Sequence, residues 1–201
     1  MANWASTSYV IEGPRKTLEW IERAIFESLA NNEACGDERD ILDRLGIKWE
    51  PRNIESHTGH YLRGAILEET TRWEGDILRF DAEEAWGVTD FDDCLKSKFP
   101  DIKVFWVTQE EGCEVYQTND AEGKYFPDRY WVDTCIDAIY KSEYFKTEEA
   151  AYKWLSTITS GRVTDEDSAS QFNDDYADSG ADDENFIYIH KFDIISTPSC
   201  K

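Results

Sequence analysis

Residues 77–117 follow the most regular pattern of the chain, and this pattern restricts the fold more than any other stretch does. Over 78–83, apolar and charged side chains alternate, which is the two-residue period of a strand with one buried face. Residues 89–99 then place their apolar side chains on one helical face, and Pro100 ends that helix because proline lacks an amide hydrogen. The β-branched and aromatic run 104–107 predicts an inner strand, which a turn connects to a third strand.

The preceding residues predict the other half of a split β-α-β layout. A strand over 7–12 ends at Gly13, and a helix follows whose apolar residues share one stripe up to Leu29. A strand over 65–73 then turns back into the strand that begins at Ile77. We therefore predict an α+β fold, namely a ferredoxin-like split β-α-β sandwich in which an antiparallel sheet carries its helices on one face.

The expected organisation is a core with a C-terminal extension. Residues 1–118 form the ferredoxin-like core, with an insertion at 33–64 that is predicted to hold a short helix and a long loop. Residues 119–201 form the extension, in which Thr147 is a good helix cap followed by two glutamates that complement the helix dipole. The extension is expected to contain strands, a helix over 147–159, an acidic loop over 164–185 and a last strand over 186–195.

The net charge of −22 is the strongest global property of the chain. Such a surface repels nucleic-acid backbones and anionic membranes, so we predict no direct binding to nucleic acid, no membrane partner, and a preference for a basic protein surface. The segment 164–185 carries no lysine or arginine and is expected to be mobile or loosely attached. Its acidic residues are Asp165, Glu166, Asp167, Asp174, Asp175, Asp178, Asp182, Asp183 and Glu184.

The five cysteines are scattered and odd in number, and no two have C-x-x-C spacing. This pattern predicts reduced thiols in a cytoplasmic protein rather than a disulfide framework. The N-terminal residues lack a basic region followed by an apolar core, so no signal peptide is expected. No apolar run approaches membrane-spanning length. Cys113 is predicted to be a buried thiol within a strand.

The sequence contains no concentration of catalytic residue types and no cofactor motif, so we predict no catalytic, cofactor-binding or metal-binding residue. His57 and His60 stand in an H-T-G-H sequence, but a zinc site needs further ligands and no neighbouring cysteine supplies one. An EF-hand alignment that starts at Asp175 lacks the bidentate glutamate. An iron–sulfur cluster would require grouped cysteine thiolates, which a ferredoxin-like topology does not imply.

Two blocks of the chain resemble the YubB ferredoxin-like family of bacterial, plasmid and phage proteins. The opening N-W-A-S-T-S-Y-V-I-E-G-P is similar to that family's start, an Asn-Trp-Cys motif followed by a strand and Gly-Pro. The later A-E-E-A-W-G, a helix ending in Phe-Pro, and V-F-W-V-T-Q-E-E-G-C-E-V-Y resemble its second block. Ala5 stands where the family usually carries cysteine, so this chain lacks any role of that thiol. The resemblance implies a ferredoxin-like fold and a mobile-element setting, and it implies no activity.

Two function classes and the oligomeric state stay open at this point. The favoured hypothesis is a non-enzymatic protein that binds a basic protein surface through the acidic residues of 165–184. One form of it is a nucleic-acid mimic that occupies the groove of a nucleic-acid-binding protein. Exposed aromatic residues, with Trp86 and Trp131 as candidates, would add to such an interface. The alternative is a hydrolase with an acidic, metal-assisted cleft, since 43 acidic residues make carboxylate pairs unavoidable.

Overall fold

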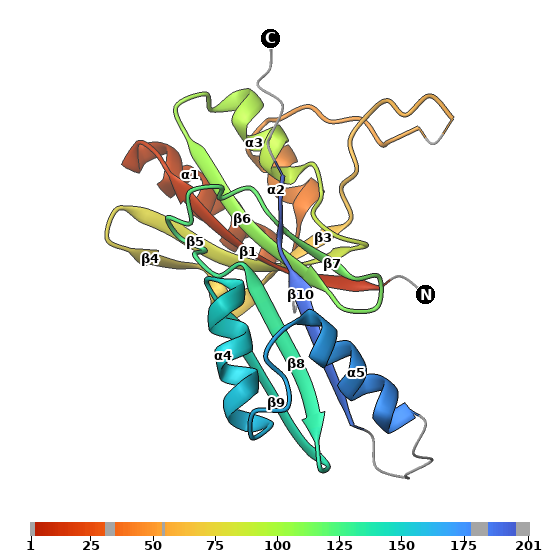
Figure 1. Cartoon of the computed structure of the whole chain (residues 1–201). Helices are drawn as coiled ribbons and strands as arrows, with labels where there is room; N and C mark the ends of the chain where they lie inside the picture. Colours follow the sequence, from red (N-terminus) through yellow and green to blue (C-terminus); the bar gives the residue numbers. More distant parts are fainter. Residues whose placement is uncertain (1–2, 31–34, 54, 178–184, 196–201) are drawn as a thin grey trace. The chain divides into compact units, whose positions relative to one another are not determined.

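The computed structural model of the chain describes residues 3–30, 35–53, 55–177 and 185–195 (Figure 1). The protein is a mixed α+β molecule whose main sheet is mostly antiparallel. It divides into two compact units. Residues 1–121 together with 195–201 are called the N-terminal unit, and residues 122–194 are called the C-terminal unit. The boundary that we expected lay after residue 118.

The N-terminal unit contains one sheet and the helices that precede its strands. The strands are β1 (Trp4–Glu12), β2 (Cys35–Asp37), β3 (Gly64–Leu67), β4 (Arg72–Glu74), β5 (Ile77–Ala85), β6 (Lys103–Glu110) and β7 (Val115–Thr118). The helices are α1 (Arg15–Leu29), α2 (Glu38–Arg44) and α3 (Phe91–Lys98). In the sheet, these strands lie in the order β7-β6-β1-β5-β3-β2, and β4 also pairs with β5. All of these pairings are antiparallel.

This sheet has more strands than the four of a ferredoxin-like sandwich, so the predicted layout needs correction. The strand expected over 65–73 is broken into β3 and β4 by a 3₁₀ turn at Glu68–Thr70. The Thr70 hydroxyl stabilises the break, because it donates to the Leu67 carbonyl and accepts the Asp81 amide, both at 2.9 Å. The insertion also adds β2, which pairs with β3 at the edge of the sheet.

The core of the N-terminal unit lies between one face of the sheet and the three helices (Figure 1). The predicted alternation of β5 is confirmed, since Leu78, Phe80 and Ala82 point into this core. On the neighbouring strand, the Tyr9 ring stacks on Phe80 with centroids 5.0 Å apart. The predicted apolar stripe of α1 is buried against the same face. Burial of such side chains contributes roughly 1.5–3 kcal/mol each.

Cys113 does not lie in a strand, contrary to the prediction. It is exposed within the turn that connects β6 to β7, and β7 begins only at Val115. The buried Glu110 carboxylate closes this turn by accepting the amides of Gly112 at 2.9 Å and Cys113 at 2.5 Å. These side-chain hydrogen bonds replace the ladder that a longer strand would need, so the turn is wider than the sequence suggested.

The C-terminal unit is a three-stranded sheet covered by two helices (Figure 1). Its elements are β8 (Tyr130–Ile136), β9 (Ile139–Phe145), α4 (Glu148–Ile158), α5 (Glu166–Ala177) and β10 (Phe186–Lys191), followed by the short strand β11 (Asp193–Ile194), which does not belong to this three-stranded sheet. The sheet order is β10-β8-β9, and both pairings are antiparallel. Thr147 caps α4 as its sequence predicts, because its side chain accepts the Ala150 amide.

The acidic loop predicted over 164–185 is corrected by the structure, which places helix α5 within it. Ala169 and Phe172 are buried on the inner side of this helix, in the same core as Val132 and Ile187 of the sheet. Charge composition argued for a loop, but two apolar side chains at helical spacing are enough to attach the segment when a sheet face is available. The segment is therefore a packed element between 166 and 177.

Candidate functional site

Helix α5 carries most of the described acidic residues of the segment 164–185 on its exposed side. Glu166, Asp167, Asp174 and Asp175 are all exposed. Asp167 and Asp174 are two helical turns apart and lie in line, and Glu166 and Asp175 flank them on the two sides of the exposed half of the helix. No lysine or arginine interrupts them along the helix. The result is a strip of four carboxylates on a defined scaffold, which we call the α5 acidic strip.

Local and tertiary hydrogen bonds hold this strip in place. At the helix start, Asp165 Oδ1 accepts the Ser168 hydroxyl at 2.7 Å and the Ser168 amide at 2.9 Å, and these hydrogen bonds lower the pKa of Asp165. Further along, the Asn173 side chain both donates to and accepts from the backbone of Ile187, each at 2.9 Å. The two bonds join the inner side of α5 to β10, so the strip cannot rotate freely.

Two members of the strip lie where a carboxylate does not stabilise a helix. Asp174 and Asp175 occupy the last turn of α5, where the helix dipole favours positive charge, and no basic residue lies in that turn. Each such charge costs about 0.3–1 kcal/mol. A hydrogen bond from the Gln171 amide to Asp175, at 2.6 Å, offsets part of this cost. A positively charged partner surface would relieve both conflicts.

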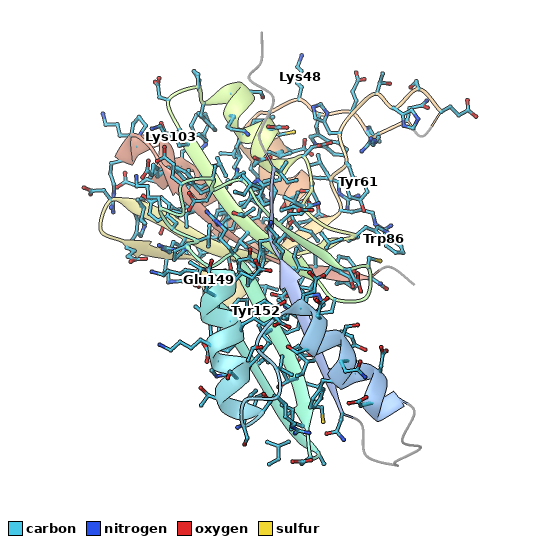
Figure 2. All side chains as sticks on the ribbon, viewed as in Figure 1. Lys48, Tyr61, Trp86, Lys103, Glu149 and Tyr152 are labelled. Atoms are coloured by element: carbon cyan, nitrogen blue, oxygen red, sulfur yellow. The ribbon has the colours of Figure 1, made fainter. Side chains whose placement is uncertain are left out.

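The remaining interaction candidates from the sequence have different outcomes. Asp178, Asp182, Asp183 and Glu184 lie outside the described residues. Trp86 follows the end of β5 (Figure 2), is 49% exposed, and adopts a positive φ of 67°. Trp131 is only 7% exposed, and its ring stacks on His190 with centroids 5.1 Å apart. Of the two tryptophans, only Trp86 is available to a partner.

Sequence analysis missed the aromatic character of one face of the small sheet. Register places Tyr144, Trp131 and His190 in one row across β9, β8 and β10. A second row pairs Tyr140, which is 63% exposed, with the Phe186 ring at 5.4 Å. The signal was the even spacing of Tyr140 and Tyr144 in β9 and of the aromatic residues of β10, which puts these side chains on one side of the sheet, whereas Phe145 lies on the other side. This face is opposite the helices and carries exposed tyrosines.

A pair of buried glutamates is the most unusual feature of the N-terminal unit. Glu38, at the start of α2, and Glu84, on β5, are both completely buried. The Thr89 hydroxyl lies 2.9 Å from Glu38 Oε1 and 3.0 Å from Glu84 Oε1, and the Tyr9 hydroxyl donates to Glu84 at 2.7 Å. Burial, and then the neighbouring Glu84 carboxylate, raise the pKa of Glu38 well above its ordinary value. Burial also raises the pKa of Tyr9.

Of the two glutamates, only the burial of Glu84 could be predicted from the sequence. Glu84 continues the buried positions 78, 80 and 82 of β5, so strict alternation predicts a carboxyl group in the core. Nothing local distinguishes Glu38 from an ordinary glutamate of a first helical turn. The pair does not constitute a catalytic cleft, because neither side chain is exposed to a substrate. Its chemistry is the retention of a proton inside the core.

Several further expectations concern sites and membranes. Within the described ranges, no group of three or more His, Cys, Asp or Glu residues is arranged to hold a metal ion. In that same part of the chain, none of the helices is both long and apolar enough to cross a membrane. Cys94, Cys113 and Cys135 are unpaired thiols. No protein-family model, curated protein or solved structure matches this chain.

Proposed function

We propose that this protein is a non-enzymatic binding protein that engages a basic protein surface through the α5 acidic strip. The observation that carries the proposal is the position of four exposed carboxylates on one side of a packed helix, two of them against the helix dipole. A cationic partner would neutralise these two charges and offset their unfavourable interaction with the helix dipole. The acidic residues Asp178, Asp182, Asp183 and Glu184 follow the strip in the sequence and lie outside the described residues.

The partner class follows from the charge pattern. A strip of carboxylates without intervening cations presents a line of negative charge, as a nucleic-acid backbone does. A nucleic-acid-binding protein with a basic groove is therefore the favoured partner, and the proposal includes a mimic that competes with nucleic acid. The net charge of −22 would speed the encounter with such a partner at low ionic strength.

The fold assignment that accompanies this proposal is a ferredoxin-like core. The strands β6-β1-β5-β3 with helices α1 and α3 have the order and directions of a split β-α-β sandwich, enlarged here by β2, β4 and β7. Together with the opening motif of the chain, this supports kinship with the YubB-like proteins and a cytoplasmic, mobile-element setting.

The test compares two variants that change the charge equally. One is Glu166→Gln, Asp167→Asn, Asp174→Asn and Asp175→Asn on α5. The control neutralises four exposed carboxylates of the N-terminal unit, through Glu69→Gln, Asp76→Asn, Glu83→Gln and Asp101→Asn. Each protein is immobilised and exposed to a bacterial lysate. Retained proteins are eluted with salt or with duplex DNA and are then identified by mass spectrometry.

The expected result is a nucleic-acid-binding protein that the unmodified protein and the control retain and the α5 variant does not. Elution by salt and by DNA would show that charge and the nucleic-acid groove carry the contact. Equal retention by the α5 variant would refute the strip as the interface and direct attention to the exposed tyrosines of β9 and β10. No specific partner for any of the three proteins would overturn the binding function itself.

A further inference from the structure

A basic pocket lies in the N-terminal unit of this acidic protein. The cavity has a volume of about 440 Å³, and nine residues line it. Three are arginines and two are histidines, namely Arg39, Arg52, Arg63, His57 and His60. None of the nine is an aspartate or glutamate, although acidic residues outnumber lysine and arginine by 43 to 21 in the chain. Two of the three histidines of the chain are gathered here.

The backbone around the pocket is fixed to the rest of the unit. Tyr61 is labelled in Figure 2. Its amide donates to the Asp90 carboxylate at 2.6 Å, and its hydroxyl donates to the Ala85 carbonyl at 2.7 Å. The Ala85 amide in turn donates to the Arg63 carbonyl at 3.0 Å. These bonds attach residues 61–63 to the end of β5, so Arg63 extends from a rigid support.

The opposite wall of the pocket is a narrow loop. The Arg52 amide donates to the His60 carbonyl at 3.0 Å, and the His60 amide donates to the Glu50 carbonyl at 2.7 Å. Gly59 has a φ of 85°, and a Cβ at this position would lie 2.5 Å from the Pro51 carbonyl oxygen. Only glycine permits this close approach, which brings both histidines and Arg52 toward Arg63.

Two of the three arginines that line the pocket differ from the third in their ion pairs. Arg39 is ion-paired with Asp37, with Nε 3.0 Å from Oδ1. Arg52 and Arg63 form no ion pair with any carboxylate in the described ranges. His60 accepts the Glu50 amide at Nδ1, which leaves Nε2 to carry a hydrogen in the neutral ring. Two guanidinium groups and an imidazole therefore supply donors without a competing acceptor.

The lining also has an apolar and aromatic part. Trp49 and Tyr61 contribute rings, and Pro51 and Leu62 contribute aliphatic surface. The Trp49 indole is held in place by a hydrogen bond to Asp43 at 3.0 Å. A volume of about 440 Å³ exceeds what a bare oxyanion fills and is within the usual range of small-molecule sites. The pocket thus combines anion recognition with room for a ring.

We propose that this pocket binds a small phosphate monoester whose organic part carries a ring, the chemical class of a nucleoside monophosphate. Arg52 and Arg63 would hold the phosphate through paired N–H donors, which match the geometry of its oxygens. The rings of Trp49 and Tyr61 would contact the organic part. The net negative charge of the protein does not prevent this binding, because at physiological salt the interactions between exposed charges are largely screened beyond about 8 Å. The proposal is independent of the α5 acidic strip.

The test is titration calorimetry with the full chain and adenosine 5′-monophosphate as the probe. The test variant is Arg52→Gln with Arg63→Gln. The control variant is Arg23→Gln with Lys103→Gln, which removes the same charge from exposed positions outside the pocket lining (Lys103 is labelled in Figure 2). Inorganic phosphate and adenosine are titrated separately, and circular dichroism verifies that every variant is folded.

The expected result is equal binding to the unmodified protein and to the control. The variant that lacks Arg52 and Arg63 should bind about tenfold or more weakly for each of these two arginines. Adenosine alone should bind far more weakly, since it lacks the charged group. No binding of the monophosphate to the unmodified protein, or equal binding to the double arginine variant, would overturn the proposal. Inorganic phosphate that binds as tightly as the monophosphate would overturn the claim that the ligand carries a ring.

Discussion

Replacing Glu38 with glutamine should change the pH dependence of the stability of the N-terminal unit. Burial and the adjacent Glu84 raise the pKa of Glu38 in the folded protein, whereas an unfolded chain has an ordinary glutamate near pH 4.3. Between these two pKa values the folded state holds one more proton than the unfolded state. The stability that this proton supports is fully present below about pH 4.3 and is lost as the pH rises through the folded pKa.

The magnitude follows from one proton. Linkage gives a loss of about 1.4 kcal/mol of unfolding free energy per pH unit between the unfolded and the folded pKa. Glutamine resembles the protonated acid and cannot ionise, so Glu38→Gln removes this loss. The variant keeps an oxygen for the Thr89 hydroxyl, and Glu84 keeps its hydrogen bonds from the Tyr9 hydroxyl and the Thr89 amide. The stability of the variant relative to the unmodified protein should therefore rise by about 1.4 kcal/mol for each pH unit in that window.

Urea unfolding followed by tryptophan fluorescence measures this difference, because most tryptophans belong to the N-terminal unit. These are Trp4, Trp20, Trp49, Trp73, Trp86 and Trp106. The control is Glu83→Gln, the same substitution at an exposed position next to Glu84 on β5. A stability difference between Glu38→Gln and the unmodified protein that stays constant from about pH 5 to about pH 8 would refute the buried proton. So would an equal pH effect of Glu83→Gln.

Two further predictions concern other positions of the N-terminal unit. A Cβ on Gly64 would lie 2.6 Å from Glu38 Cδ and 2.8 Å from Glu84 Cγ, so Gly64→Ala should cost about 1–3 kcal/mol in urea unfolding. Gly36→Ala, whose Cβ would lie 3.4 Å from its nearest neighbour, is the control, and an equal loss in both would contradict the close contact. Burial raises the pKa of Cys94 to about 12, whereas Cys113 is exposed. A thiol reagent should therefore label Cys113 rapidly and Cys94 only on unfolding, and comparable labelling rates by mass spectrometry would contradict this.

Elements whose defining interactions lie within a few residues of each other could be predicted from the sequence. The apolar stripe of α1, the end of α3 before Pro100 and the Thr147 cap of α4 all appear in the structure as expected. The same is true of the alternation in β5. In each case the hydrogen bond or the periodicity that forms the element is local, so nearby residues contain the necessary information.

Helix α5 could not be predicted in this way, because its stability is not local. Its acidic composition disfavours an isolated helix, and its local interactions are limited to the hydrogen bonds between Asp165 and Ser168 at its start and the pair Gln171–Asp175. The burial of Ala169 and Phe172 and the double hydrogen bond between Asn173 and Ile187 stabilise it. Similarly, Thr70 breaks a predicted strand only because the Asp81 amide on β5 lies within its reach.

What the sequence by itself determined is the α+β class, most of the element order and the strong negative charge. Only the tertiary structure decided which ionisable side chains come together. Glu38 meets Glu84 because α2 packs over the sheet at Gly64, where the absent side chain leaves room for both carboxyl groups. Arg52 and Arg63 share a pocket because Gly59 folds the loop back on itself. Such encounters depend on distances in space between residues far apart in the chain, and local patterns do not encode these distances.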